Sequence, residues 1–193
     1  GKFVDRFEAD LAAYTGAKTV VVGRDTRASS PELFDALVEG LTDAGADVVD
    51  VGLVATPEFY FAVASAGYDG GIMVTASHNP AKYNGLKVVG PGAVPLGGDT
   101  GLEEIKKRAL GGESIKRAKG RVTRRDILND YLDKLFSLVP ASAIDKNWRA
   151  VIDTGNGMAG VIESDLWKRL GNQMTQLHFK LDGTFPNHEP DPS

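Results

Sequence analysis

The stretch TASHNPAKYNGLK, residues 75–87, contains a serine, a histidine and a lysine, three residue types that can carry out chemistry. Ser77 and His78 follow the apolar run GIMV, where a predicted strand gives way to a loop. Consecutive side chains of an extended chain point in opposite directions, which makes direct proton transfer between Ser77 and His78 awkward. The sequence also lacks a G-x-S-x-G elbow, so it disfavours a serine hydrolase and leaves phosphoryl transfer or a plain loop serine.

Phosphoryl transfer suits a serine that has no well-placed general base. This chemistry needs charge neutralisation and in-line positioning more than a strong base, so a serine beside cationic groups and a divalent ion can accept and donate a phosphoryl group. Lys87 lies ten residues beyond Ser77, after the turn formers Asn84 and Gly85, and could return to the same edge of the sheet. On spacing alone, an exposed strand lysine is the simpler interpretation of Lys87.

Two arginines flank Asp25 and Thr26 directly after the apolar run TVVVG. Arg24 and Arg27 suit contact with a phosphate, because guanidinium groups bind oxyanions through charge-assisted hydrogen bonds. The same arginines could instead pair with Asp25 in a purely structural loop. The sequence leaves both interpretations open.

A second motif, Gly155-x-Gly157-x-x-Gly160, follows the apolar run AVIDT and opens a predicted helix. That context is the one a dinucleotide-binding turn requires, and Asp182 lies 22 residues beyond the last glycine. The pattern is short, however, and Asp182 falls past the end of the next predicted strand. A tight strand–helix turn, in which glycines permit close packing, is the competing and preferred interpretation.

Strand and helix signals alternate along residues 1–143, which predicts an α/β domain with a mixed sheet sandwiched by helices. Because ligands gather beyond the carboxyl ends of the strands, RDTR at 24–27 and TASHNP at 75–80 are expected to share one edge. Ser29 and Glu32 have the spacing of a capping box. The expected elements are helices over 2–14, 30–44, 56–66, near 100–110 and 126–138, strands over 18–23, 47–52, 70–76 and 85–90, and a loop or hairpin over 91–101.

Residues 144–193 predict the first part of a second α/β domain, with a strand at 148–153, a helix at 155–171 and a strand at 174–179. A βαβ piece of about 50 residues buries a poor share of its surface by itself. The sequence therefore indicates one complete domain followed by an incomplete second one.

Composition limits the function classes. The formal charge of −4 and the pI near 5.4 argue against a broad nucleic-acid or anionic-membrane surface, but they permit a small phosphorylated ligand. The chain has no cysteine and only three histidines, none paired at a helix-face spacing, so thiolate and histidine metal sites are not expected. Absence of cysteine, of a signal peptide and of an apolar run of about 18 residues favours a cytoplasmic protein.

Four motifs together resemble the phosphohexomutases, the phosphomannomutase/phosphoglucomutase family. They occur in the family's order and cover most of the chain: GRDTR at 23–27, GIMVTASHNPAKYNGLKV at 71–88, DTGNGMAG at 153–160 and DGTFPNHEPDP at 182–192. The long serine motif is highly specific. The resemblance implies movement of phosphate between C1 and C6 of a hexose phosphate through a phosphoserine and a bisphosphorylated sugar, with no nucleic acid or membrane as partner.

The resemblance also implies roles for individual residues. Ser77 would carry the phosphoryl group and ligate a Mg²⁺, and Lys87 would lie near the reacting hydroxyl for proton transfer or charge stabilisation. His78 would belong to the catalytic serine loop and Asn79 would shape it beside the substrate. The basic positions Arg24 and Arg27 would contact phosphate or carboxylate groups.

This chain departs from the family pattern in what it lacks. It has neither the aspartate-rich DGDxDR-type loop that supplies the other Mg²⁺ ligands nor the later sugar- and phosphate-recognition loops. We therefore expect the first domain and roughly half of the second from a four-domain enzyme, inactive alone and weak in Mg²⁺ affinity. A free-standing sugar-phosphate-binding domain and a dinucleotide-binding module are the alternatives.

Overall fold

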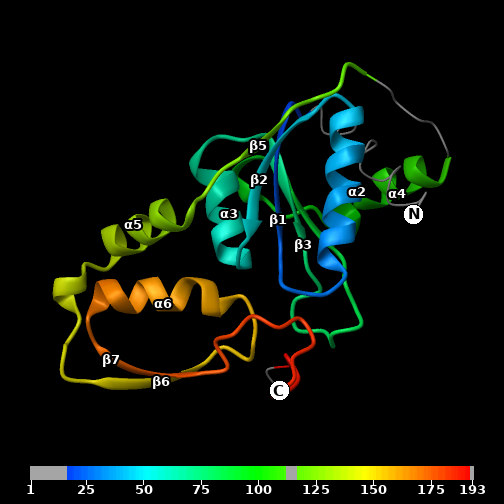
Figure 1. The fold of residues 1–193 in the computed structure, drawn as a ribbon. Coiled ribbons are helices and arrows are strands. Elements are labelled where there is room, and N and C mark those ends of the chain that lie inside the picture. The colour runs from blue at the N-terminus through cyan, green and yellow to red at the C-terminus, as the bar shows by residue number, and fades with distance from the viewer. Residues whose placement is uncertain (1–16, 112–116, 192–193) are drawn as a thin grey trace.

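The structure is a computed structural model that describes residues 17–111 and 117–191. The larger part is a five-stranded sheet with helices on both faces, and the smaller part is a two-stranded sheet with one helix (Figure 1). This arrangement confirms the predicted α/β class and the mixed sheet. The helix expected over 2–14 lies outside the described residues.

The strands of the larger sheet follow the order β4-β3-β1-β2-β5. β4 runs antiparallel to β3, and the remaining pairs are parallel. β5 was not predicted from the sequence, because this three-residue edge strand is exposed at every residue and has no apolar pattern. The bounds are β1 Thr19–Arg24, β2 Asp47–Leu53, β3 Gly70–Val74, β4 Leu86–Val89 and β5 Val122–Arg124.

Helices cover the two faces of this sheet because the strand side chains alternate between them. Val20 and Val22 of β1 pack in the same cluster as Leu37 of α2, whereas Val21 packs in the opposite cluster with Phe59 of α3. Figure 1 shows α2 and α3 on opposite sides of the sheet. The helices of this part are α2 Ser30–Asp43, α3 Thr56–Ser65, α4 Leu102–Gly111 and α5 Leu128–Leu138.

The start of α2 differs from the expected capping box. Ser29 has helical dihedrals, φ −87° and ψ −7°, and its side chain makes no cap hydrogen bond. The hydroxyls of Ser29 and Ser30 instead accept hydrogen bonds from the Asn84 amide, and the Ser30 hydroxyl donates to Asp25. These serines therefore tie α2 to the loops at the carboxyl edge of the sheet.

The smaller part contains β6 Arg149–Asp153, α6 Ala159–Leu170 and β7 Gln173–Leu177, with the two strands parallel. This confirms the expected strand, helix and strand of residues 144–193. Val151 and Leu177 stay 69% and 40% exposed, so this small sheet leaves apolar side chains uncovered. The boundary between residues 143 and 144 remains a prediction.

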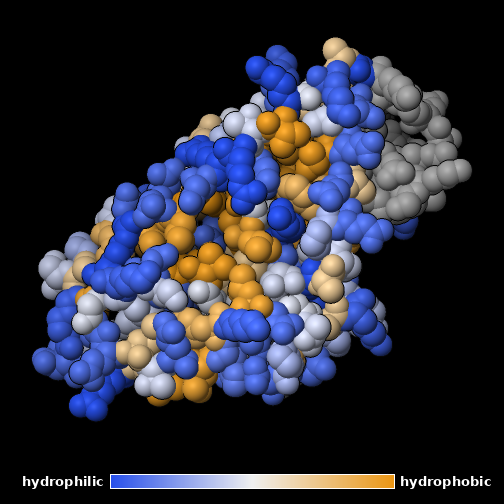
Figure 2. Space-filling view, viewed as in Figure 1, coloured by the Kyte–Doolittle hydropathy of each residue, from blue (hydrophilic) through white to orange (hydrophobic). Residues whose placement is uncertain are grey.

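Apolar surface also gathers between the two parts. Figure 2 shows hydrophobic residues in the region between α3, α5 and α6. None of the helices within the described residues is long and apolar enough to cross a membrane.

Glu58 is a buried carboxyl at the start of α3. It is only 1% exposed, and it accepts a hydrogen bond of 2.8 Å from the Ala55 N–H. Burial raises the pKa of Glu58 to about 7; the Ala55 N–H opposes this rise, and the nearby charge of Asp126 adds to it. A carboxyl at this position therefore stays partly protonated near neutral pH.

Glu58→Gln should flatten the pH dependence of stability. Between pH 4.5 and about 7 the folded chain binds more protons than the unfolded one, so the free energy of unfolding of the native chain falls as pH rises. Glutamine keeps the acceptor for Ala55 without an ionisable group. The free energy of unfolding of the variant minus that of the native chain should rise by roughly 2–3 kcal/mol from pH 4.5 to pH 8. Urea unfolding at each pH measures this difference. Parallel curves for both chains would contradict the buried, protonated carboxyl.

Candidate active site

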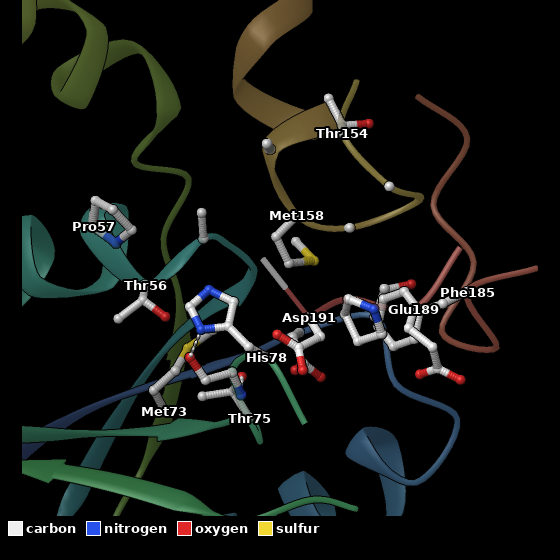
Figure 3. Close-up of a pocket in the computed structure, with 18 of the residues that line it drawn as sticks. Thr56, Pro57, Met73, Thr75, His78, Thr154, Met158, Phe185, Glu189 and Asp191 are labelled. Carbon is white, nitrogen blue, oxygen red and sulfur yellow. Dashed lines mark hydrogen bonds between the residues drawn. The ribbon is translucent and has the colours of Figure 1, made fainter. Parts of the chain in front are cut away.

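A cleft of about 580 Å³ lies between the carboxyl edge of the larger sheet and the loops of the smaller part. β1 and β3 are neighbours in this sheet, and the Asp25 N–H donates to the Val74 carbonyl over 3.0 Å. The expected shared edge of RDTR and TASHNP is therefore confirmed. Figure 3 shows His78 in this cleft, with Met158 of the smaller part above it.

Ser77 lines the cleft in an unusual backbone conformation. Its φ is 55°, in the left-handed region that few residues other than glycine adopt. The Ser77 N–H donates to the Thr75 hydroxyl over 3.0 Å, and the Ser77 hydroxyl lies 3.4 Å from His78 Nδ1. The expectation that the two side chains diverge is therefore wrong, because the chain here is not extended. The contact is long for a hydrogen bond.

Lys87 reaches the same cleft from β4. Because β4 runs antiparallel to β3, with Lys87 opposite Met73, the chain returns to the carboxyl end of β3. Lys87 and Ser77 both line the cleft, which confirms the shared edge that the sequence suggested for them. An ammonium group at this place can offset the negative charge of a phosphoryl group.

Arg27 has a structural role instead of the direct phosphate contact that the sequence allowed. Its side chain is fully buried, and its Nε donates to Asp25 over 3.1 Å. Its two terminal nitrogens donate to four backbone carbonyls of the serine loop, those of Ser77, Asn79, Pro80 and Tyr83, over 2.8–3.1 Å. All five N–H groups of the guanidinium are thus used within the chain.

Arg24 and Asn79 lie outside the lining of the cleft. Arg24 stacks on the Phe34 ring at 4.5 Å and lies 3.9 Å from the Asp50 carboxylate. The Asn79 side-chain amide donates to the Ala76 carbonyl over 2.8 Å, which closes the turn after Ser77. Neither side chain meets the cleft in this structure, and their predicted substrate contacts stay predictions.

The smaller part closes the cleft through a very close main-chain approach. A Cβ on Gly183 would lie 2.2 Å from the Thr26 carbonyl oxygen, so only glycine fits there. Beside it, the Phe185 ring lies 5.2 Å from the Arg27 guanidinium. The loop after β7 is therefore seated on the loop after β1.

An acid–base cluster on the smaller part was missed by the sequence analysis. His188 Nε2 lies 3.3 Å from the Asp153 carboxylate, and His178 Nε2 lies 3.8 Å from it. The Glu189 carbonyl and the Asp153 carboxylate raise the pKa of His188, while the Gly155 N–H and then His188 lower the pKa of Asp153. No spacing rule links these residues, since strand ends and a distant loop bring them together. Asp153 and His188 of this cluster line the cleft.

The glycine turn before α6 serves packing. A Cβ on Gly155 would lie 2.8 Å from the His188 ring, and one on Gly160 would lie 2.6 Å from the Phe179 carbonyl oxygen. The Asp182 carboxylate accepts hydrogen bonds from Thr184. These contacts support the tight strand–helix turn over the dinucleotide alternative.

The described residues hold no cluster of side chains that is characteristic of a metal site. Among residues 17–111 and 117–191 there is no group of three or more histidine, aspartate or glutamate side chains placed to hold a metal ion. Ser77 offers a single oxygen, whereas Mg²⁺ is bound through several oxygen ligands. Mg²⁺ therefore stays a prediction that rests on the resemblance.

Comparison with known proteins gives a consistent set of relatives. A family model described as phosphoglucomutase/phosphomannomutase, alpha/beta/alpha domain I, matches residues 2–116. A phosphomannomutase of Vibrio cholerae serotype O1 is 44% identical over 181 residues, covering 91% of this chain and 39% of the relative. A phosphoglucomutase of Neisseria meningitidis serogroup B is 40% identical over 190 residues, covering 96% of this chain and 39% of the relative.

A solved structure of a phosphoglucomutase/phosphomannomutase family protein from Burkholderia thailandensis has the same fold. It superposes with a TM-score of 0.82 at 38% identity, covering 99% of this chain and 42% of that protein. The chain thus spans about two fifths of the length of these relatives.

Arg27→Met should collapse the serine loop. The change leaves the buried Asp25 carboxylate without its cation and four loop carbonyls without donors, so we expect a loss of about 3–5 kcal/mol in the free energy of unfolding. Arg27→Lys keeps the charge but not the five-donor geometry, so its loss of free energy of unfolding should be smaller than that of Arg27→Met. Thermal and urea unfolding measure both, with Arg121→Met, at an 86% exposed arginine, as the matched control.

A role of Arg27 only in substrate contact predicts a different result. Both Arg27 variants would then be as stable as the native chain in the absence of ligand. Equal unfolding curves for Arg27→Met and Arg121→Met would contradict the structural role of Arg27.

Proposed function

The chain belongs to the phosphoglucomutase/phosphomannomutase family, and on that premise we propose that it carries the phosphoserine domain of a hexose-phosphate mutase. The proposed net reaction moves a phosphoryl group between the C1 and C6 oxygens of a hexose phosphate. The observation that carries the proposal is the convergence of Ser77 and Lys87 on one cleft, from the single motif TASHNPAKYNGLK.

Ser77 is the proposed carrier of the phosphoryl group. In the first step the bond between its Oγ and phosphorus breaks as a sugar hydroxyl oxygen bonds to that phosphorus, which gives a bisphosphorylated hexose. In the second step the phosphoryl group at the other end of the sugar returns to Ser77. The cleft of about 580 Å³ is large enough for a hexose phosphate, which supports this substrate class.

The neighbours of Ser77 have separate roles in the proposal. Lys87 offsets the charge of the transferring phosphoryl group and exchanges a proton with the reacting sugar hydroxyl. His78, 3.4 Å from the Ser77 hydroxyl, orients that oxygen, and Arg27 holds the loop that presents it. His78 and Arg27 are therefore proposed as positioning groups.

Two further expectations belong to the same proposal. When bound, Mg²⁺ would supply positive charge against the phosphate oxygens beside Ser77. A cytoplasmic location follows from the absence of cysteine in the sequence and from the small phosphorylated substrates of the proposed reaction. Both are predictions from the sequence and its resemblance.

The 193-residue chain alone should show no mutase turnover. It contains no group of three metal-binding side chains among its described residues, and it spans about two fifths of the length of its relatives. A coupled assay of glucose 1-phosphate conversion with and without Mg²⁺ measures this. Robust turnover by the purified chain would overturn the expectation that further domains are needed.

The role of Ser77 can be tested in a chimera. Residues of this chain replace the matching segment of the Vibrio cholerae phosphomannomutase, over which the two are 44% identical. The chimera should gain about 80 Da on incubation with a hexose bisphosphate, one phosphoryl unit by intact-mass measurement. Ser77→Ala should abolish both this species and turnover.

Ser137→Ala provides the control for the chimera. Ser137 lies on α5, is exposed, and bonds only the Lys134 carbonyl in this structure, so its loss should leave phosphorylation and turnover unchanged. Turnover by the Ser77→Ala chimera at the rate of the Ser137→Ala chimera would remove the basis of the proposed mechanism.

A further inference from the structure

A second cavity, of about 270 Å³, lies at the ends of β1 and β2 beside the segment that follows β5. It shares no lining residue with the Ser77 cleft. Three arginines line it: Arg24, Arg124 and Arg125. Val161 of α6 also contributes, so the cavity adjoins the smaller part as well. The proposed phosphoserine mechanism gives none of these side chains a step, and of the three arginines only Arg24 was expected from the sequence to contact substrate.

The two arginines nearest the sheet have more positive charge than their partner neutralises. Arg24 lies 3.9 Å and Arg124 lies 3.4 Å from one shared carboxylate, that of Asp50. Asp50 also accepts a short hydrogen bond of 2.7 Å from the Gly52 N–H. One carboxylate against two guanidinium groups leaves a net charge of +1 in this triad.

Arg24 has a buried donor without an acceptor. Its NH1 nitrogen is shielded from solvent and has no hydrogen-bond partner among the described residues. The Phe34 ring, 4.5 Å from the guanidinium carbon, fixes the orientation of this group. This buried nitrogen faces the Asp50 carboxylate 3.9 Å away, and 21% of the Arg24 side chain stays exposed, so the rest of the guanidinium is the part that a ligand can reach.

The other charged groups of the cavity limit the ligand. Arg125 donates hydrogen bonds to Tyr68 and Asp130, and the Asp130 carboxylate offsets its charge. Asp126 accepts a hydrogen bond from the Leu128 N–H at the start of α5. Glu58, whose pKa burial raises to about 7, is partly neutral at physiological pH and repels an anion less than an ordinary glutamate.

We propose that this cavity binds a phosphate group through Arg24 and Arg124, as a site separate from the Ser77 cleft. Paired guanidinium groups match the oxygen geometry of a phosphate, and the single Asp50 carboxylate offsets the charge of only one of the two. The volume of 270 Å³ lies near the lower end of ligand pockets, roughly 300–1,000 Å³, which suits inorganic phosphate or a small sugar phosphate.

Amide chemical shifts of the 193-residue chain test the proposal. Inorganic phosphate is titrated against chloride at constant ionic strength, so that general screening stays fixed. The amides of Leu53, Val54 and Leu128, which line the cavity, should shift and saturate. Shifts confined to the Ser77 cleft, or shifts that do not saturate, would overturn the proposal.

Two variants connect the shifts to the arginines. Arg124→Gln should weaken phosphate binding at the cavity about tenfold, the value of one charge-assisted contact. Arg121→Gln, at the residue directly before the same strand and 86% exposed, should leave it unchanged. Arg24→Gln should abolish it. Arg124 is 73% exposed, so we expect the Arg124→Gln chain to fold. It therefore tests the phosphate site even where the Arg24 variant fails to fold.

A second titration with glucose 1-phosphate identifies the source of the phosphate group. Saturation at a lower concentration than inorganic phosphate assigns the cavity to a sugar phosphate, and equal saturation assigns it to the free ion. Both results support a phosphate site. An Arg124→Gln chain that binds either ligand as tightly as the Arg121→Gln chain would refute it.

Discussion

The buried guanidinium of Arg27 is the interaction on which the rest of the site depends. A cation without access to water must have every donor satisfied, and here four backbone carbonyls of residues 77–83 and the Asp25 carboxylate do so. The carbonyls are thereby turned inward, and the loop has no freedom to relax. A loop held in this way keeps the Ser77 hydroxyl at the cleft without any secondary structure of its own.

The same arginine links the two parts of the molecule. Phe185 of the smaller part lies over the Arg27 guanidinium, and Gly183 lies against the Thr26 backbone. The loop after β1 therefore holds the serine loop through Arg27 and also contacts the loop after β7, which forms the other wall of the cleft. The geometry of the cleft therefore depends on one buried side chain, that of Arg27, and on one close backbone contact, that of Gly183 with Thr26.

Periodicity and turn chemistry predicted most of the fold. Local sequence patterns determine the strands from Thr19 to Val89, their helices and the shared edge of the two loops. These features were therefore predicted correctly. β5 and the histidine–aspartate cluster depend on tertiary contacts between distant residues, so no local pattern reports them. Arg27 is the instructive case, because a basic residue beside a serine loop has the same sequence signature whether it binds phosphate or the loop itself.

The left-handed backbone at Ser77 limits which hydroxyl-bearing residue can occupy that position. Threonine has the same nucleophilic oxygen, but its second branch on Cβ makes positive φ a marked outlier. An alcohol at this turn must therefore be unbranched. The backbone conformation at this turn therefore favours serine over threonine for steric reasons, whatever the relative reactivity of the two alcohols.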